Sequence, residues 1–154
     1  MKHGYELVAA MMLAVSFASA QQESKAKIGE RLPDGTAYAG ISPNTHKPMY
    51  TTPVDAGVYS WKKVGQYCTN LEVDGHRDWR MPSKGELNVL FQNRAAIGGF
   101  DTTGSTPDGS YWSAPPQGDY STGGDYFSSW LQRFSDGIGF DAGRFNVSSL
   151  RCVR

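Results

Sequence analysis

The sequence contains few of the residues from which metal centres and nucleophilic sites are built. Its 154 residues include two cysteines and three histidines, and no H-x-x-x-H or H-x-E spacing occurs. His46 and His76 both lie beside turn-forming residues, where a solvated side chain is the ordinary role. No G-x-S-x-G segment gives a serine the context of a nucleophile. We therefore expect no histidine-bound metal and no enzymatic activity.

An excess of charge of one sign is also missing. Lys and Arg together number 15, Asp and Glu together number 15, and the formal net charge is zero. A neutral chain has no general attraction to nucleic acid or to an anionic membrane surface, so neither is an expected partner. The 18 glycines and the 12% of aromatic residues instead favour short strands, many turns and a modest core built around large rings.

Long apolar runs are rare, and the clearest one lies near the start of the chain. It covers Leu7–Phe17, follows a short polar segment and precedes Ala18–Ala20. This pattern is typical of a cleaved secretory signal peptide over residues 1–20, and the run is too short for the alternative, a membrane anchor. We expect a periplasmic or secreted protein with no membrane span after cleavage. A flexible lead-in over 21–31 and one domain over 32–154 would follow.

The two cysteines are Cys68 and Cys152. In an exported protein two cysteines most often form a disulfide, and the alternative is a pair of free thiols, one of them reactive. A link across so long a loop would stabilise the fold by roughly 4–5 kcal/mol on chain-entropy estimates.

A change of period after Ser60 predicts a first helix. Large or apolar side chains recur along one helical face, at Trp61, Val64, Tyr67, Cys68 and Leu71. Ser60 can cap the start of this helix, and Asp74-Gly75 forms the turn after it. Cys68 is therefore expected on the buried face.

The stretch HRDWRMPSKGELNVLF predicts a strand-to-helix corner. Ser83 and Glu86 have the spacing of a capping box, which starts a second helix. Pro82 keeps the preceding residue extended, so Trp79 is expected to enter the core and Arg80 to point outward. The apolar stripe of this helix is Leu87, Leu90 and Phe91, and the helix ends at Gly98-Gly99.

Short strands are predicted on both sides of the helices. Pro43-Asn44-Thr45 has the composition of a hairpin turn between two strands. After Gly99, the segments GSYWSAP, DYFSSWLQRFSDG, GIGFDAG and SSLRCVR predict short antiparallel strands, with Asp136-Gly137 as a hairpin turn. In the last strand, Leu150 and Cys152 share one face, which we expect to point toward the first helix. The fold class is α+β.

The motifs DWRMPSKGELNVLF, YWSAP, WLQRFSDG and LRCVR, in this order, resemble the bacterial DUF1566 family, which includes the C-terminal domain of the Legionella collagen-like adhesin. The resemblance covers residues 60–154. It implies a C-type lectin-like fold, with two helices packed on short antiparallel sheets and a long loop-rich region. Trp79, Arg80 and Pro82 match the corner of the family, and Cys68 and Cys152 match its disulfide. Formylglycine-generating enzymes share this fold, but their oxidase chemistry needs reactive thiols.

Calcium-dependent sugar binding would need a particular set of oxygen ligands. The E-P-N, Q-P-D and W-N-D triplets of many animal C-type lectins do not occur here. Isolated aspartates in TPDG and GGDY could bind calcium through oxygen atoms, although Asx turns beside glycine explain them as well. We expect no cofactor and leave calcium open.

Aromatic and arginine side chains after Gly99 are the candidates for recognition, because such residues bury area at little entropic cost. Trp112, Trp130 and Phe134 are expected to fill the core. The predicted ligand-binding residues are Tyr120, Asp125, Tyr126, Arg133, Asp141 and Arg144. We expect recognition of carbohydrate or another surface polymer through residues 105–146. The alternative is a protein–protein or structural module of the cell envelope.

Overall fold

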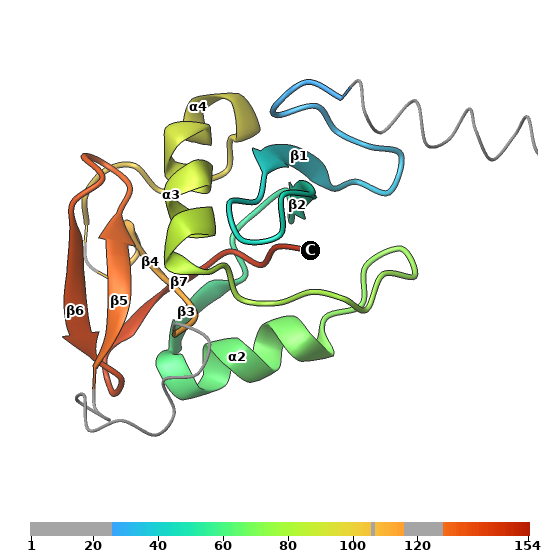
Figure 1. Ribbon diagram of the computed structural model, residues 1–154. Helices are drawn as coiled ribbons and strands as arrows, with labels where there is room; N and C mark the ends of the chain where they lie inside the picture. The colour runs from blue at the N-terminus through green and yellow to red at the C-terminus, as the bar shows by residue number, and fades with distance from the viewer. Residues whose placement is uncertain (1–25, 106, 116–127) are drawn as a thin grey trace, which may run out of the picture.

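The computed structural model describes residues 26–105, 107–115 and 128–154 (Figure 1). The strands are β1 (Ala37–Ile41), β2 (Pro48–Thr51), β3 (Gly57–Ser60), β4 (Ser110–Trp112), β5 (Ser128–Arg133), β6 (Gly139–Gly143) and β7 (Val147–Leu150). The helices are α2 (Trp61–Asn70), α3 (Lys84–Gln92) and α4 (Arg94–Ile97). The predicted α+β class is confirmed, and the predicted signal peptide lies outside the described residues. No helix of the described ranges is long and apolar enough to cross a membrane.

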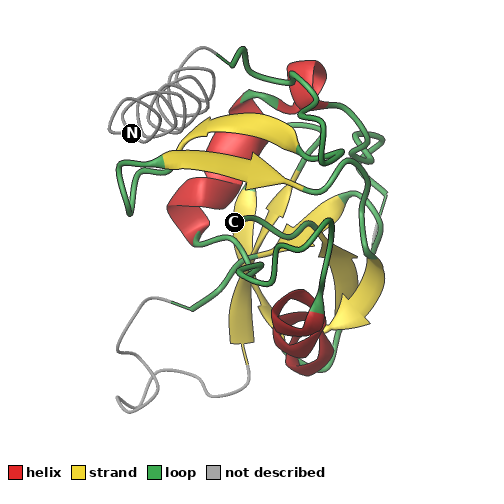
Figure 2. Ribbon diagram, turned by 90° about the vertical axis from the view of Figure 1, so that its right-hand side faces the viewer, coloured by secondary structure: helices red, strands yellow, loops and turns green. Residues whose placement is uncertain are grey.

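The first sheet is the antiparallel hairpin of β1 and β2. A β-bulge shifts its register between Tyr38 and Gly40, and Gly40 takes a φ of 117°, which favours glycine. The predicted turn at Pro43-Asn44-Thr45 connects the two strands. Figure 2 shows this sheet lying across α3.

The second sheet has five strands in the order β3-β7-β4-β5-β6. Its strands pair antiparallel except β4 and β7, which run parallel through Tyr111 and Ser149. The expectation of antiparallel strands throughout is therefore wrong at this position. Beyond β7 the chain continues beside both sheets, because Val153 forms bridges with Thr51 and with Arg80.

Helix α2 carries the disulfide. Val64 and Cys68 are its fully buried residues, and Cys68 is bonded to Cys152 as predicted. Ser60 occupies the N-cap position, but its side chain makes no capping hydrogen bond, so the predicted cap is wrong. Ser60 is also the last residue of β3, where it pairs with Val147.

Helix α3 begins at a reciprocal capping box. The amide of Glu86 donates to Ser83 Oγ at 3.1 Å, and the amide of Ser83 donates to Glu86 Oε2 at 3.0 Å. The helix ends at Gln92, and Asn93 separates it from α4 while its side-chain amide donates to the carbonyl of Ala39. Each of these bonds satisfies a backbone group that a helix end or a bulge would leave unpaired.

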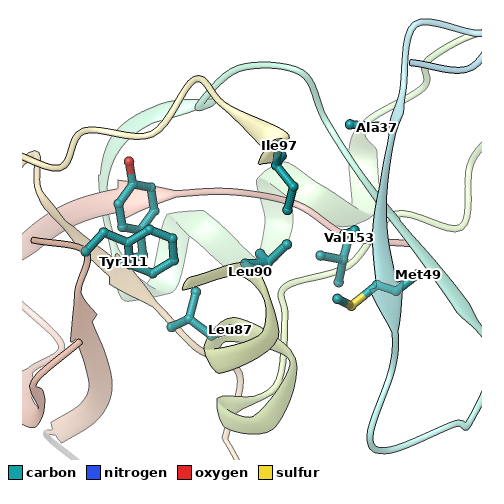
Figure 3. Close-up of a cluster of buried hydrophobic side chains, with 9 residues drawn as sticks. Ala37, Met49, Leu87, Leu90, Ile97, Tyr111 and Val153 are labelled. Atoms are coloured by element: carbon teal, nitrogen blue, oxygen red, sulfur yellow. The ribbon is translucent and has the colours of Figure 1, made fainter. Parts of the chain in front are cut away.

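Two apolar clusters form the core. The first packs around α3 and includes Leu87, Leu90, Tyr111 and Val153 (Figure 3). The second surrounds the disulfide and contains Val64, Cys68, Trp79, Met81, Trp112, Leu131, Leu150 and Cys152. Trp112 and Phe134 are fully buried as expected. Trp130 is a correction, because it is only partly buried and the Lys84 ammonium lies 3.3 Å from its ring centroid.

Candidate functional site

A shallow apolar groove on the five-stranded sheet, which we call the sheet groove, is the first candidate site. It encloses about 380 Å³. It is lined by Pro107, Ser110, Leu131, Phe140, Ala142, Asn146, Val147 and Ser148. The lining residues come from β4, β5, β6, β7 and two loops, and the groove falls almost entirely within the region where recognition was predicted.

Strand alternation places the side chains of the sheet groove on one face. Leu131 of β5 is directly opposite Phe140 of β6, and Ser129 is opposite Ala142, so these four side chains point to the same side of the sheet. The opposite face carries Tyr111 and is covered by α3 (Figure 1). Helix α2 and the disulfide cluster cover the remainder of the groove face, near Leu131 and Trp112.

The polar atoms of the sheet groove lie at its walls. Ser110 has no exposed surface, and within the described part of the chain its Oγ has no hydrogen-bond partner. Ser148 is also buried, whereas Asn146 is exposed. Asn146 is therefore the polar side chain of the lining that a ligand in the groove can reach.

Two of the apolar side chains that line the sheet groove are exposed to solvent. Phe140 is 37% exposed and Val147 is 47% exposed. With Leu131, Ala142 and Pro107 they give an apolar floor with a few polar groups around it. Pockets of this composition are the usual form of a small-ligand site.

The structure gives the predicted ligand-binding residues different surroundings. Tyr120, Asp125 and Tyr126 lie outside the described residues. Asp141 is exposed on β6, and it alternates with Phe140 and Ala142, so its side chain points away from the sheet groove.

The two predicted arginines are engaged with their own neighbours. Arg133 donates to Asp136 through Nε and Nη2, and this contact raises the pKa of Arg133 and lowers the pKa of Asp136. Arg144 donates from Nε to the carbonyl of Ser128 at 3.0 Å and to Ser129 Oγ at 2.9 Å. Its guanidinium also lies 3.9 Å from the ring centroid of Trp61. A ligand would therefore compete with existing contacts for either arginine.

The predicted ligand-binding residues did not include Asn146, Val147 or Ser148, which line the sheet groove, although Asn146 lies within the predicted region 105–146. The two-residue alternation of β7 puts Ser148 on the same face as Leu150, but only the strand order brings β7 to the groove. Short aromatic strands do not reveal their order from sequence.

A second hollow, of about 330 Å³, lies beside α2. It is lined by Tyr59, Lys63, Gln66, Tyr67, Asn70 and Leu71. The rings of Tyr59 and Tyr67 are stacked with centroids 5.3 Å apart, and Tyr59 Oη donates to the carbonyl of Ala56. The hollow is bounded by one helix and one strand end, and Tyr59 already has a hydrogen-bond partner. We therefore favour the sheet groove.

The predicted corner residues are architectural in their contacts. Trp79 is 2% exposed and belongs to the disulfide cluster. Arg80 is partly exposed, but its guanidinium turns back to both carboxylate oxygens of Glu86. Pro82 accepts a hydrogen bond at its carbonyl from the amide of Ala114, which connects the corner to the chain after β4.

Comparison with known proteins identifies the family of the chain. A search of curated proteins found no match. The family model described as Lcl C-terminal domain matches residues 41–154, which cover β2, the whole five-stranded sheet, the three described helices and both cysteines. The chain belongs to the Lcl C-terminal domain family, which is the DUF1566 family that its corner, strand and C-terminal motifs resemble.

Proposed function

We propose that this chain is an exported bacterial recognition domain that binds carbohydrate or another surface polymer in the sheet groove. Membership in the Lcl C-terminal domain family suggests a surface or adhesin-like module. The observation that carries the proposal is the groove itself, about 380 Å³ in volume, with an apolar floor and the exposed Asn146 amide at its wall. A C-type lectin-like architecture is part of the same proposal.

The chemistry of the sheet groove suits a sugar ring. A pyranose has one face of C–H groups and a rim of hydroxyls, so it needs an apolar surface with hydrogen-bond groups beside it. Phe140 and Val147 offer the apolar surface, and the exposed Asn146 amide offers hydrogen-bond donors and an acceptor.

Recognition in the sheet groove requires no metal in this proposal. Within the described ranges there is no group of three or more His, Cys, Asp or Glu side chains that could hold a metal ion. The lining residues also include no carboxylate, which is the ligand that calcium favours.

The test is a polysaccharide and glycan array followed by calorimetry on each ligand found. We expect Phe140→Ala and Asn146→Ala each to weaken binding by at least tenfold, because each removes a side chain that touches the ligand. Ile41→Ala is the matched control, since Ile41 is 49% exposed on β1, away from the groove. Chelator in the buffer should change neither the affinity nor the melting temperature.

Two results would refute this proposal. One is ligand binding that survives both groove substitutions while the variants remain folded. The other is binding that needs calcium, which would direct attention to a site outside the sheet groove.

A further inference from the structure

Strand β6 is an edge of the five-stranded sheet. The strand order ends β4-β5-β6, and in the described part of the chain β6 pairs with β5 alone. Figure 1 shows β6 at the outer side of the sheet, away from α2, β1 and β2. Its other long side therefore has a row of backbone groups with no strand partner among the described residues.

The hydrogen-bond pattern shows which backbone groups point outward. The amide of Arg133 donates to the carbonyl of Ile138 at 2.9 Å, so Ile138 faces β5. In an antiparallel pair the bonded positions alternate, so Phe140 and Ala142 also face β5. The amide N–H and C=O groups of Gly139 and Asp141 then point away from the sheet, and we find no hydrogen bond to them among the described residues.

Exposed apolar side chains gather around this edge. Ile138, directly before β6, and Phe140, within β6, are 55% and 37% exposed. These two side chains are two residues apart, so they lie on the same face and form a small exposed apolar surface at the edge. The edge therefore combines an apolar surface with outward backbone donors and acceptors.

Asp141 adds a charge at the centre of β6. It is exposed, and among the described residues no Lys, Arg or His forms an ion pair with it. It lies between Phe140 and Ala142 and points to the other face of the sheet. A strand added beside β6 would thus meet apolar groups on one face and a carboxylate on the other.

We propose that the outer edge of β6 docks an extended segment of a partner protein, which adds a strand to the sheet. An extended polypeptide carries N–H and C=O groups at the repeat that Gly139 and Asp141 present. Charge complementarity with Asp141 selects a segment in which apolar residues alternate with basic ones. The proposal goes beyond polymer recognition in the sheet groove and does not rest on it.

A second copy of this chain fits the edge less well. Antiparallel pairing of β6 with its own copy about the centre of the strand would place two Asp141 carboxylates opposite each other, and like charges directly opposite destabilise a sheet. The same carboxylate attracts a basic residue. Asp141 thus favours a partner of different sequence.

The experiment is an NMR titration of the purified protein with an acetylated and amidated seven-residue peptide of alternating valine and lysine. We expect chemical-shift changes concentrated at the amides of Gly139, Asp141 and Gly143. Asp141→Pro should weaken binding at least tenfold, because it removes an outward N–H and leaves the bonds to β5 in place. Asp141→Asn keeps that N–H and removes the charge, so it should weaken binding only severalfold.

A matched peptide keeps the test decisive if Asp141→Pro does not fold. The same peptide with N-methyl groups on alternate residues cannot complete the ladder and should bind the unaltered protein at least tenfold more weakly. Absence of shifts at β6 up to millimolar peptide, or equal binding of the N-methylated peptide, would overturn the proposal. Self-association in sedimentation that the peptide displaces would assign the edge to a second copy and would overturn it too. Glycan binding is also measured on Asp141→Pro, so that a failure of the proposed docking edge can be told apart from a failure of the proposed sheet groove site.

Discussion

Arg80 and Arg151 each pair with a carboxylate inside the fold. The two pairs differ in the hydrogen-bond donors that replace the water lost by the carboxylate on burial. Glu86 has no exposed surface and accepts hydrogen bonds from both terminal nitrogens of Arg80, from Ser42 Oγ and from the amide of Ser83. Burial raises its pKa, but these donors outweigh burial and bring the pKa of Glu86 to about 2.

In the pair of Arg151 and Asp55, burial outweighs the hydrogen bonds. Asp55 accepts from Arg151 Nε at 2.7 Å and from Tyr111 Oη at 2.6 Å. Burial is the larger effect here and raises the pKa of Asp55 despite these contacts, and it lowers the pKa of Arg151. A buried carboxylate is therefore stabilised as an anion only when enough donors surround it, and a cation nearby is not sufficient.

Removing Arg151 should have the largest effect. Arg151 is completely buried, and it also donates to the carbonyls of Thr52 and Gly99 and lies over the ring of Phe100. Arg151→Met leaves these acceptors and Asp55 without their cation, and we expect a loss of about 3–5 kcal/mol in unfolding free energy. Urea unfolding measures it.

The double variant Arg151→Met with Asp55→Leu is the control for this prediction. It removes both charges, so it should recover part of the loss. A loss below about 1 kcal/mol in the single variant would show that Arg151 does not hold these loops together.

Glu86→Gln should have the next largest effect. The amide side chain keeps the volume but loses the charge that both Arg80 nitrogens bond, so we expect a loss of about 2–3 kcal/mol by the same measurement. Ser42→Ala removes one donor and leaves the ion pair, so its loss should be smaller. Equal losses would mean that the Ser42 hydroxyl, and not Arg80, keeps Glu86 ionised.

The stability of the protein in acid should depend on the two carboxylates in opposite ways, because the pKa of Glu86 is lowered and the pKa of Asp55 is raised. The lowered pKa of Glu86 contributes stability above its ordinary pKa of 4.5 that is lost as pH falls toward about 2. The raised pKa of Asp55 contributes stability at low pH that is lost as pH rises through its folded-state pKa.

Urea midpoints measured from pH 7 to pH 2.5 test this difference. Glu86→Gln should flatten the acid loss by roughly 2 kcal/mol, after allowance for the partly exposed Arg80. Asp55→Asn should steepen the loss instead. Parallel curves for the two variants would contradict the assignment.

The same contrast explains which parts of the molecule could be predicted from sequence. The cap of α3 was predictable because Ser83 and Glu86 are three residues apart and their bonds are local. The contact of Arg151 with Asp55 joins residues 96 positions apart, and no spacing rule connects them. Ser60 has the same kind of N-cap position and nearly the same backbone angles as Ser83, but its side chain makes no capping bond, so the position alone did not decide the cap.

The candidate site, too, could be predicted only as far as local sequence patterns reach. The region of recognition could be placed after Gly99 from its aromatic composition, but the sheet groove depends on the strand order. Trp130 was wrongly assigned to the core because its alternation with Phe134 gives the face of the strand and not what covers that face. The start of α3 lies there, and Lys84 covers the ring in place of apolar side chains.

A third pair completes the comparison and should have the smallest effect. Arg77 donates to Glu72 at 2.9 Å, a distance close to those of the buried pairs, but the two side chains are 76% and 52% exposed. Water solvates both charges in the folded and the unfolded protein, so little is gained when they meet. We expect Glu72→Gln to change the unfolding free energy by less than about 0.5 kcal/mol, and less still in high salt. A loss as large as that of Glu86→Gln would mean that proximity of charge, and not the replacement of water by donors, decides what such a pair contributes.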